Sequence, residues 1–317
     1  MRAFIFPGQG SQFLGMGQDL AATYTEAKSV FQEVDDALSQ NLSALMMSGE
    51  EATLNLTENT QPALMAVSMA VVRVLEKQGG FTLAEKASFV AGHSLGEYTA
   101  LTAARSFPLA DAARLLKKRG QAMQAAVPVG VGAMAAILGL DMDAVQAIVA
   151  QAAIAAKGEC IAAANDNSTG QVVISGHRNA VTLAIALATA AGAKRAIELP
   201  VSAPFHCDLM LPAARVMADA LMQTAIQAPA LPLIANVTAD VVTDPDMIRD
   251  LLVQQVTGTV RWRESVQTMV DKGVDTFIEL GAGKVLNGLV KRGAPDATLY
   301  SVGTPAQIDD ILTVLTQ

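Results

Sequence analysis

The stretch SFVAGHSLGE, residues 88–97, decides the fold. Its first five residues form an apolar segment typical of a buried strand, and residues 95–104 have the composition of a helix. Between them, residues 92–96 match G-x-S-x-G, the pattern in which a serine lies on a sharp turn from strand to helix. Gly92 and Gly96 keep side chains away from that turn, and the helix N-terminus favours negative charge near Ser94. We therefore expect an α/β protein in which Ser94 is an exposed nucleophile.

The segments around this turn predict a large α/β core. Residues 3–6 form a short apolar strand that leads into PGQGSQ, a loop rich in backbone donors. Helical periodicity follows near 22–39, 62–78 and 109–126, and residues 60–62 (TQP) are typical of a helix cap followed by a first-turn proline. After residue 200 the pattern predicts helices at 207–225, 245–256, 262–272 and 284–292, and strands at 231–236, 275–280 and 297–302.

The middle of the chain has a different pattern. Strands are predicted at 131–138, 159–164, 171–175 and 194–199, and helices at 141–155 and 178–191, with glycines at the connections. The order β-α-β-β-α-β is that of a ferredoxin-like unit. We predict a small inserted subdomain at 129–198 and a discontinuous large subdomain at 1–128 and 199–317, with a cleft between them as the site.

Composition excludes several classes of protein. The chain has 317 residues, half of them apolar, and a net charge of −8, which argues against a nucleic-acid partner. No apolar run reaches the roughly 18–20 residues that a membrane-spanning helix needs, and the start lacks the features of a leader, so we expect a cytoplasmic protein without a membrane partner. Cys160 and Cys207 match no metal-ligand spacing, and we expect neither a metal nor another cofactor.

A nucleophilic serine needs a base, and the chain has three histidines. His93 is expected to point away from Ser94 on the turn, and His177 is expected to begin a helix of the inserted unit in solvent. His206 lies where the chain returns from the insert to the large core, next to the expected cleft, and is our predicted base. No aspartate stands out as a third member, and Asp208 is too close in sequence to orient His206, so a carbonyl group is the expected partner.

The order of these residues differs from that of a serine hydrolase, in which the histidine lies near the end of the chain. Five separated motifs together suggest a different family. They are FPGQGSQ at 6–12, GHSLGE at 92–97, KRG at 118–120, APFH at 203–206 and ELGAGKVL at 279–286. In kind and in order they resemble the malonyl-CoA:acyl carrier protein transacylases, of the acyltransferase family of fatty-acid and polyketide synthesis. The resemblance covers nearly the whole chain, and it implies an α/β-hydrolase-like core with a parallel sheet.

The resemblance also implies roles for individual residues. Ser94 would carry the acyl group, His206 would act as general base and then acid, and the N–H groups of Gln9 and Leu95 would form the oxyanion hole. Gln255 corresponds to the residue whose carbonyl orients the histidine. Because residues 258–259 are Gly-Thr where the family shows Asn-Pro, Gln254 is the alternative.

Two residues would define the substrate. Taken alone, Arg119 in a Lys-Lys-Arg run is typical of a solvated helix face, but the resemblance implies that it binds the free carboxylate of malonyl, since a guanidinium can pair both oxygens. Phe205 resembles the malonyl-selecting form of its segment, in which a smaller residue would leave room for a methyl branch.

The resemblance thus implies a malonyltransferase that uses malonyl-CoA, releases CoA and acylates an acyl carrier protein in a ping-pong cycle, and we expect a monomer. The malonyl-transfer subunit of malonate decarboxylase and a freestanding polyketide acyltransferase have the same residues and stay open. A serine esterase or thioesterase is a more distant alternative, which Arg119, the GQGSQ loop and the early histidine disfavour.

Overall fold

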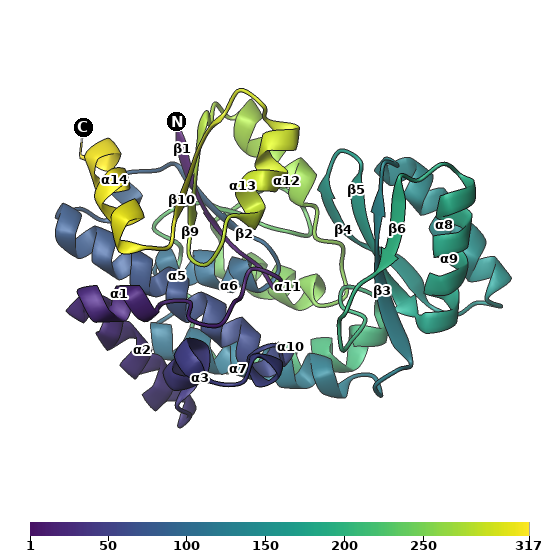
Figure 1. Ribbon diagram of the computed structural model, residues 1–317, viewed down its shortest axis with the longest axis horizontal. Helices are drawn as coiled ribbons and strands as arrows, with labels where there is room; N and C mark the ends of the chain where they lie inside the picture. The colour runs from purple at the N-terminus through teal and green to yellow at the C-terminus, as the bar shows by residue number, and fades with distance from the viewer. Residues whose placement is uncertain (317) are drawn as a thin grey trace.

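The computed structural model describes residues 1–316 and contains two separate sheets (Figure 1). The larger sheet has the order β10-β9-β1-β2-β7-β8. Its strands are β1 (Arg2–Phe6), β2 (Phe89–Gly92), β7 (Leu233–Ile234), β8 (Val241–Val242), β9 (Thr276–Leu280) and β10 (Thr298–Val302). The expected parallel sheet is confirmed for five strands, while β8 pairs antiparallel with β7 and forms one edge.

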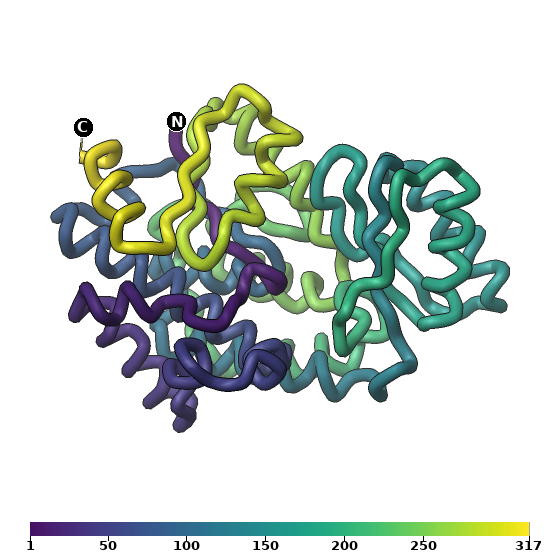
Figure 2. The backbone as a smooth tube through the Cα atoms, in the orientation of Figure 1, coloured from purple at the N-terminus to yellow at the C-terminus, as the bar shows by residue number. Residues whose placement is uncertain are grey.

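The smaller sheet is antiparallel and has the order β4-β5-β3-β6. Its strands and helices are β3 (Gly132–Leu138), α8 (Met142–Ala155), β4 (Ile161–Ser168), β5 (Gln171–His177), α9 (Arg178–Ala190) and β6 (Arg195–Glu198). Both helices lie on the face of this sheet that is remote from the larger sheet (Figure 1). The tube in Figure 2 shows the chain leaving the larger part after α7, forming this unit and returning. The chain is therefore an α/β protein with two distinct sheets.

The remaining helices surround the larger sheet. They are α1 (Gln18–Thr23), α2 (Thr25–Leu38), α3 (Leu42–Ser48), α4 (Glu51–Leu54), α5 (Thr57–Gly79), α6 (Leu95–Ala103), α7 (Leu109–Ala125), α10 (Leu211–Met222), α11 (Pro245–Gln255), α12 (Trp262–Asp271), α13 (Val285–Gly293) and α14 (Pro305–Leu315). Within residues 1–316, no helix combines the length and the apolar character needed to cross a membrane.

Strand β1 lies in the middle of the larger sheet and is buried on both faces, as its uninterrupted apolar sequence requires. Phe4 and Phe6 point into the core formed with α5, α6 and α7. Ala3 and Ile5 point the other way, into a second core with α12 and α13. Because successive side chains of a strand alternate between faces, this short strand fixes both helical layers to the sheet.

Helix α5 begins five residues earlier than the sequence predicts. Residues 60–62 were expected to cap a helix, but the helix starts at Thr57 and Pro62 lies within it. The side chains of Asn59 and Thr60 donate hydrogen bonds to the carbonyls of Thr53 and Leu54, which anchor the earlier start. The proline ring removes one helical hydrogen bond, and the buried packing of the helix compensates for it. Gln61 thereby becomes a buried helical residue.

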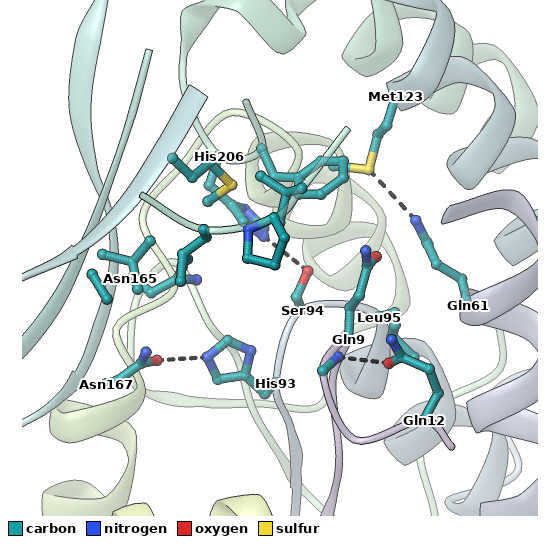
Figure 3. A pocket seen from close by; sticks show the side chains of 18 of the residues that line it. Gln9, Gln12, Gln61, His93, Ser94, Leu95, Met123, Asn165, Asn167 and His206 are labelled. Atoms are coloured by element: carbon teal, nitrogen blue, oxygen red, sulfur yellow. Dashed lines mark hydrogen bonds between the residues drawn. The ribbon is translucent and has the colours of Figure 1, made fainter. Parts of the chain in front are cut away.

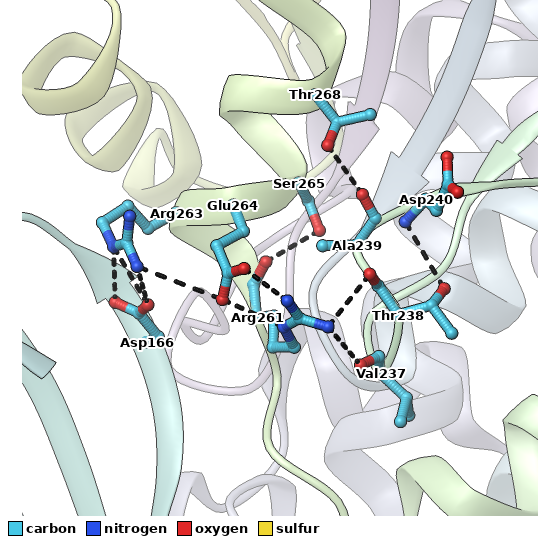
Figure 4. A network of polar contacts seen from close by, with 10 residues as sticks. All are labelled: Asp166, Val237, Thr238, Ala239, Asp240, Arg261, Arg263, Glu264, Ser265 and Thr268. Atoms are coloured by element: carbon cyan, nitrogen blue, oxygen red, sulfur yellow. Dashed lines mark hydrogen bonds and ion pairs between the residues drawn. The ribbon is translucent and has the colours of Figure 1, made fainter. Parts of the chain in front are cut away.

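Polar contacts join the smaller sheet to the larger part of the molecule (Figure 4). The carboxylate of Asp166 on β4 is buried and forms an ion pair with Arg263 on α12 at 2.8 Å. The backbone of the same strand exchanges two hydrogen bonds with Val260. The amide of Asp166 donates to the carbonyl of Val260, and the amide of Val260 donates to the carbonyl of Ala164, each at 2.9 Å. These contacts hold the smaller sheet beside the segment that follows Gln255.

Candidate active site

Ser94 lies on the predicted sharp turn, between the end of β2 and the start of α6. Its backbone angles, φ 54° and ψ −109°, are ones that L-residues rarely adopt. A Cβ atom at Gly92 would lie 1.9 Å from the carbonyl oxygen of Gly96, and one at Gly96 would lie 2.3 Å from that of Phe6. Both glycines are therefore sterically required, and the turn presents the Ser94 hydroxyl at the carboxyl end of the sheet.

The side chain of His206 contacts the side chain of Ser94 (Figure 3). The Ser94 hydroxyl lies 2.8 Å from Nε2 of His206, and Nδ1 lies 2.8 Å from the backbone carbonyl oxygen of Gln255. Because a carbonyl oxygen only accepts, we assign the proton to Nδ1, which leaves Nε2 free to accept from the hydroxyl. Burial, followed by the positive charge of Arg119, lowers the pKa of His206 to about 3. The imidazole is therefore neutral near pH 7 and can take up a proton.

The structure distinguishes the two glutamines at the end of α11. Gln255 is fully buried, and its carbonyl faces His206. Gln254 is exposed, and its carbonyl accepts from the amide of Gly258 at 2.8 Å. The carbonyl that contacts the histidine is thus the one that the sequence assigned first.

Arg119 on α7 is buried and not solvated, with 1% of its surface exposed. Its Nη1 donates to the side-chain oxygen of Gln61 at 2.8 Å, and its Nη2 donates to that of Gln255 at 2.8 Å and to the hydroxyl of Ser94 at 3.1 Å. Burial lowers the pKa of Arg119, yet a guanidinium starts so high that it stays charged. Among residues 1–316, no carboxylate forms an ion pair with it. A buried cation beside the Ser94 hydroxyl is suited to an anionic ligand.

Three further residues, which the sequence did not single out, organise this centre. Asn236, just beyond β7, accepts from the amide of Ser94 at 2.8 Å and donates to the carbonyl of Gly92 at 2.7 Å, so its side chain holds both sides of the turn. Gln61 supports Arg119, as described above. Glu97 contacts Gln255, and burial raises the pKa of its carboxyl group to about 7. The position of Asn236 at the carboxyl end of a parallel strand was the signal that could have identified it.

The predicted oxyanion donors lie at the same cavity. Leu95 is the first residue of α6, so its N–H has no acceptor within the helix. Gln9 lies in the loop after β1, and its side-chain oxygen accepts from the hydroxyl of Thr57 at 2.8 Å, which orients the loop. Both residues line the cavity that contains Ser94.

The cavity has a volume of about 550 Å³ and lies between the two sheets. The large part contributes Ser94, Arg119, Phe205 and His206, and the smaller sheet contributes Met134, Ala136, Asn165, Asn167 and Val173. His93 points away from the Ser94–His206 contact and toward the smaller sheet, where its Nε2 lies 2.8 Å from the side-chain oxygen of Asn167 (Figure 3). His177 takes no part in the site, because its Nδ1 accepts from the amide of Cys160 at the start of β4.

Comparison with known proteins identifies the family. The model of the acyl transferase domain matches residues 3–306. The malonyl CoA-acyl carrier protein transacylase of Escherichia coli K12 is 47% identical over 305 residues, which cover 96% of each chain, and that of Bacillus subtilis is 45% identical over 97% of this chain and 95% of its own. A crystal structure of the acyl-carrier-protein S-malonyltransferase of Bartonella henselae is 53% identical and superposes with a TM-score of 0.96, covering 100% of this chain and 99% of that one. The chain belongs to the acyl transferase domain family, among its malonyl CoA-acyl carrier protein transacylases.

Proposed function

We propose that Ser94 carries the malonyl group as an ester while the protein transfers it from malonyl-CoA to the phosphopantetheine thiol of acyl carrier protein. The enzyme class, an acyl-carrier-protein S-malonyltransferase of fatty-acid biosynthesis, follows from full-length similarity to the curated relatives. The observation that carries the proposed route is the contact of Ser94 with both a neutral His206 and a buried Arg119 that forms no ion pair within residues 1–316.

In the first half of the cycle, Nε2 of His206 removes the proton from the Ser94 hydroxyl. The alkoxide attacks the thioester carbonyl, and the N–H groups of Gln9 and Leu95 stabilise the oxyanion. Collapse of the intermediate breaks the carbon–sulfur bond, and the departing CoA sulfur takes the proton from His206. In the second half, His206 accepts the proton of the carrier thiol, the thiolate attacks the Ser94 ester, and the proton returns to Ser94.

Arg119 is the proposed ligand of the malonyl carboxylate. Two of its contacts, with Gln61 and Gln255, hold the guanidinium plane, and the third points at the Ser94 oxygen that would bear the acyl group. A carboxylate in the cavity would give this buried cation a directly bound counter-ion. The same arrangement would orient the acyl chain. It disfavours the esterase alternative, because a neutral acyl group cannot form an ion pair with a buried cation.

Phe205 is the proposed determinant of the unbranched acyl chain. Its ring is 9% exposed, lines the cavity and precedes His206 directly. A methyl branch would compete with this ring for space, which is worth about 1–3 kcal/mol in a packed pocket.

We propose malonyl-CoA, CoA and an acyl carrier protein as partners. One similar structure, 42% identical with a TM-score of 0.94, contains a type II polyketide acyl-carrier protein in complex with its malonyl-transacylase, which supports a carrier protein as the acceptor. The monomeric state and the cytoplasmic location stay predictions.

We also propose that residues 1–128 and 199–317 form an α/β-hydrolase-like subdomain and that residues 129–198 form a ferredoxin-like one. The order β4-β5-β3-β6, antiparallel throughout, supports the second assignment. The position of Ser94 between β2 and α6 supports the first.

Mass spectrometry tests the route. Incubation with malonyl-CoA should add one malonyl group to Ser94, Ser94→Ala should abolish the adduct, and Ser202→Ala, at an exposed serine, should retain it. Malonyl-, methylmalonyl- and acetyl-CoA are then compared as donors, each with a purified fatty-acid carrier protein and with a polyketide carrier protein as acceptor. This comparison identifies donor and acceptor together. The proposal is wrong if the wild-type protein transfers malonyl without an adduct on Ser94.

A further inference from the structure

Glu97 is a buried carboxylate that the proposed cycle does not use. It lies in the first turn of α6, three residues after Ser94, and is 1% exposed. Its Oε2 accepts from the side-chain amide of Gln255 at 2.7 Å and from the backbone amide of Asn236 at 3.2 Å. Within residues 1–316 it forms no ion pair, so these two amides are its hydrogen-bond partners.

The contact with Gln255 fixes the orientation of a carboxamide. One end of that group is an acceptor and the other a donor. The nitrogen donates to Glu97 and to the carbonyl of Ser94 at 2.9 Å, which leaves the oxygen facing Nη2 of Arg119 at 2.8 Å. If the carboxamide rotated by half a turn, its NH₂ group would face the guanidinium, and neither could accept from the other. Because Oε2 of Glu97 accepts from both amides, any proton of this carboxyl group lies on Oε1, and the contact selects the orientation that Arg119 requires.

The contact with Asn236 braces the nucleophile from the other side. The backbone amide of Asn236 donates to Glu97. The side chain of Asn236 accepts from the amide of Ser94 and donates to the carbonyl of Gly92. A single carboxylate oxygen thus connects the residue that supports the guanidinium with the residue that supports the turn.

We propose that Glu97 is a positioning residue for malonyl recognition, which acts by holding the Gln255 carboxamide so that Arg119 is aimed at the acyl site. The proposal rests on the proposed role of Arg119. Glu97 acts through other residues: the proton acceptor in contact with the Ser94 hydroxyl is His206, whereas the carboxylate of Glu97 contacts amides. Its loss should therefore affect selection of a carboxylated acyl group more than acyl transfer in general.

The test is Glu97→Met, assayed for CoA release from malonyl-CoA and acetyl-CoA with carrier protein present. Methionine has a similar length but no acceptor oxygen, so the Gln255 carboxamide loses the contact that fixes its orientation. Glu97→Gln can keep an oxygen at the Oε2 position and should retain the wild-type selectivity. For Glu97→Met we expect KM for malonyl-CoA to rise and the malonyl-to-acetyl ratio of kcat/KM to fall by about 10- to 100-fold, the change that loss of one hydrogen bond to a charged group produces. Acetyl transfer should change much less.

Gln255→Met removes the carboxamide while keeping the backbone carbonyl that faces His206, and it should lower the same ratio. In this background Glu97→Met should have little further effect on the ratio, because the two residues act in series. Glu279→Met is the matched control: Glu279 is also a fully buried carboxyl group, but it holds the amides of Leu286 and Asn287, so its substitution should leave the ratio unchanged.

An unchanged ratio in Glu97→Met, or full additivity with Gln255→Met, would overturn the proposal. If Glu97→Met does not fold, as judged by thermal unfolding, an unchanged ratio in Gln255→Met overturns it equally. Failure of the proposed function is a separate outcome, because the wild-type protein would then form no malonyl ester on Ser94.

Discussion

Replacing Arg119 by alanine should convert a malonyl-selective enzyme into one that barely distinguishes acyl groups. Arg119 is 1% exposed and its Nη2 lies 3.1 Å from the Ser94 hydroxyl oxygen, so a carboxylate bound there would be shielded from water. Hydrogen bonds to charged groups contribute about 1.5–3 kcal/mol each. A bidentate pair in a buried site should therefore contribute about 3–5 kcal/mol.

That free energy corresponds to a loss of roughly 10²- to 10⁴-fold in kcat/KM for malonyl-CoA, since about 1.4 kcal/mol is a factor of ten. Acetyl-CoA has no carboxylate, and its kcat/KM should change by less than about tenfold. Arg119→Lys keeps the charge but loses the planar pair of donors, so it should fall between the wild type and the alanine variant.

The assay is initial-rate transfer to carrier protein from each of the two thioesters, and the malonyl-to-acetyl ratio is the readout. Lys118→Ala, at the exposed neighbouring position on α7, is the control and should keep the wild-type ratio. Removing Arg119 also leaves the side-chain oxygens of Gln61 and Gln255 without their donor, which costs about 1–3 kcal/mol of stability each, so rates are compared well below the unfolding temperature. Equal losses for malonyl- and acetyl-CoA would refute carboxylate binding by Arg119.

Three further predictions concern the base, the pocket and the turn. Burial and the charge of Arg119 lower the pKa of His206 to about 3 in the ligand-free protein, so its imidazole stays neutral as the pH falls from about 8 to about 5. The second-order rate constant for acylation of Ser94 at malonyl-CoA concentrations well below saturation reports this state; it should stay nearly constant in rapid-quench mass spectrometry, and a midpoint near 6.5 would contradict this. Phe205→Ser should raise the methylmalonyl-to-malonyl ratio of kcat/KM by about 5- to 100-fold, and no change would argue against steric selection by this ring. Gly92→Ala should lower the free energy of unfolding by about 3 kcal/mol in chemical denaturation, since its Cβ would meet the carbonyl oxygen of Gly96; wild-type stability would show that the turn relaxes easily.

The sequence predicts the local parts of the site well. The turn at Ser94 is visible because strand, glycines and helix are adjacent in the chain, and His206 is identifiable because only three histidines exist and one lies where the chain re-enters the core. The β-α-β-β-α-β order of the insert follows in the same way from periodicity and glycine positions. Helix α14, in contrast, was not predicted.

The side-chain contacts of the supporting residues have no local signature in the sequence, for a physical reason. Asn236 contacts Ser94 across 142 positions of the chain, and Gln255 contacts it across 161. Neither contact leaves a periodic or local signal. Gln61 was misassigned to a cap because the earlier start of α5 depends on side-chain bonds from Asn59 and Thr60, which local propensity does not describe.

The sequence by itself predicted Ser94 as the nucleophile, His206 as its candidate base, the two kinds of sheet and the family, because these predictions depend on neighbouring residues and on motif order. Only the tertiary structure decided that Arg119 is buried without an ion-pair partner among residues 1–316, that Gln255 and not Gln254 faces His206, and that Glu97 orients the side-chain carboxamide of Gln255. Burial and hydrogen-bond direction arise when distant segments pack. A charged side chain in a helix therefore has no local feature that reveals whether it will be buried or solvated.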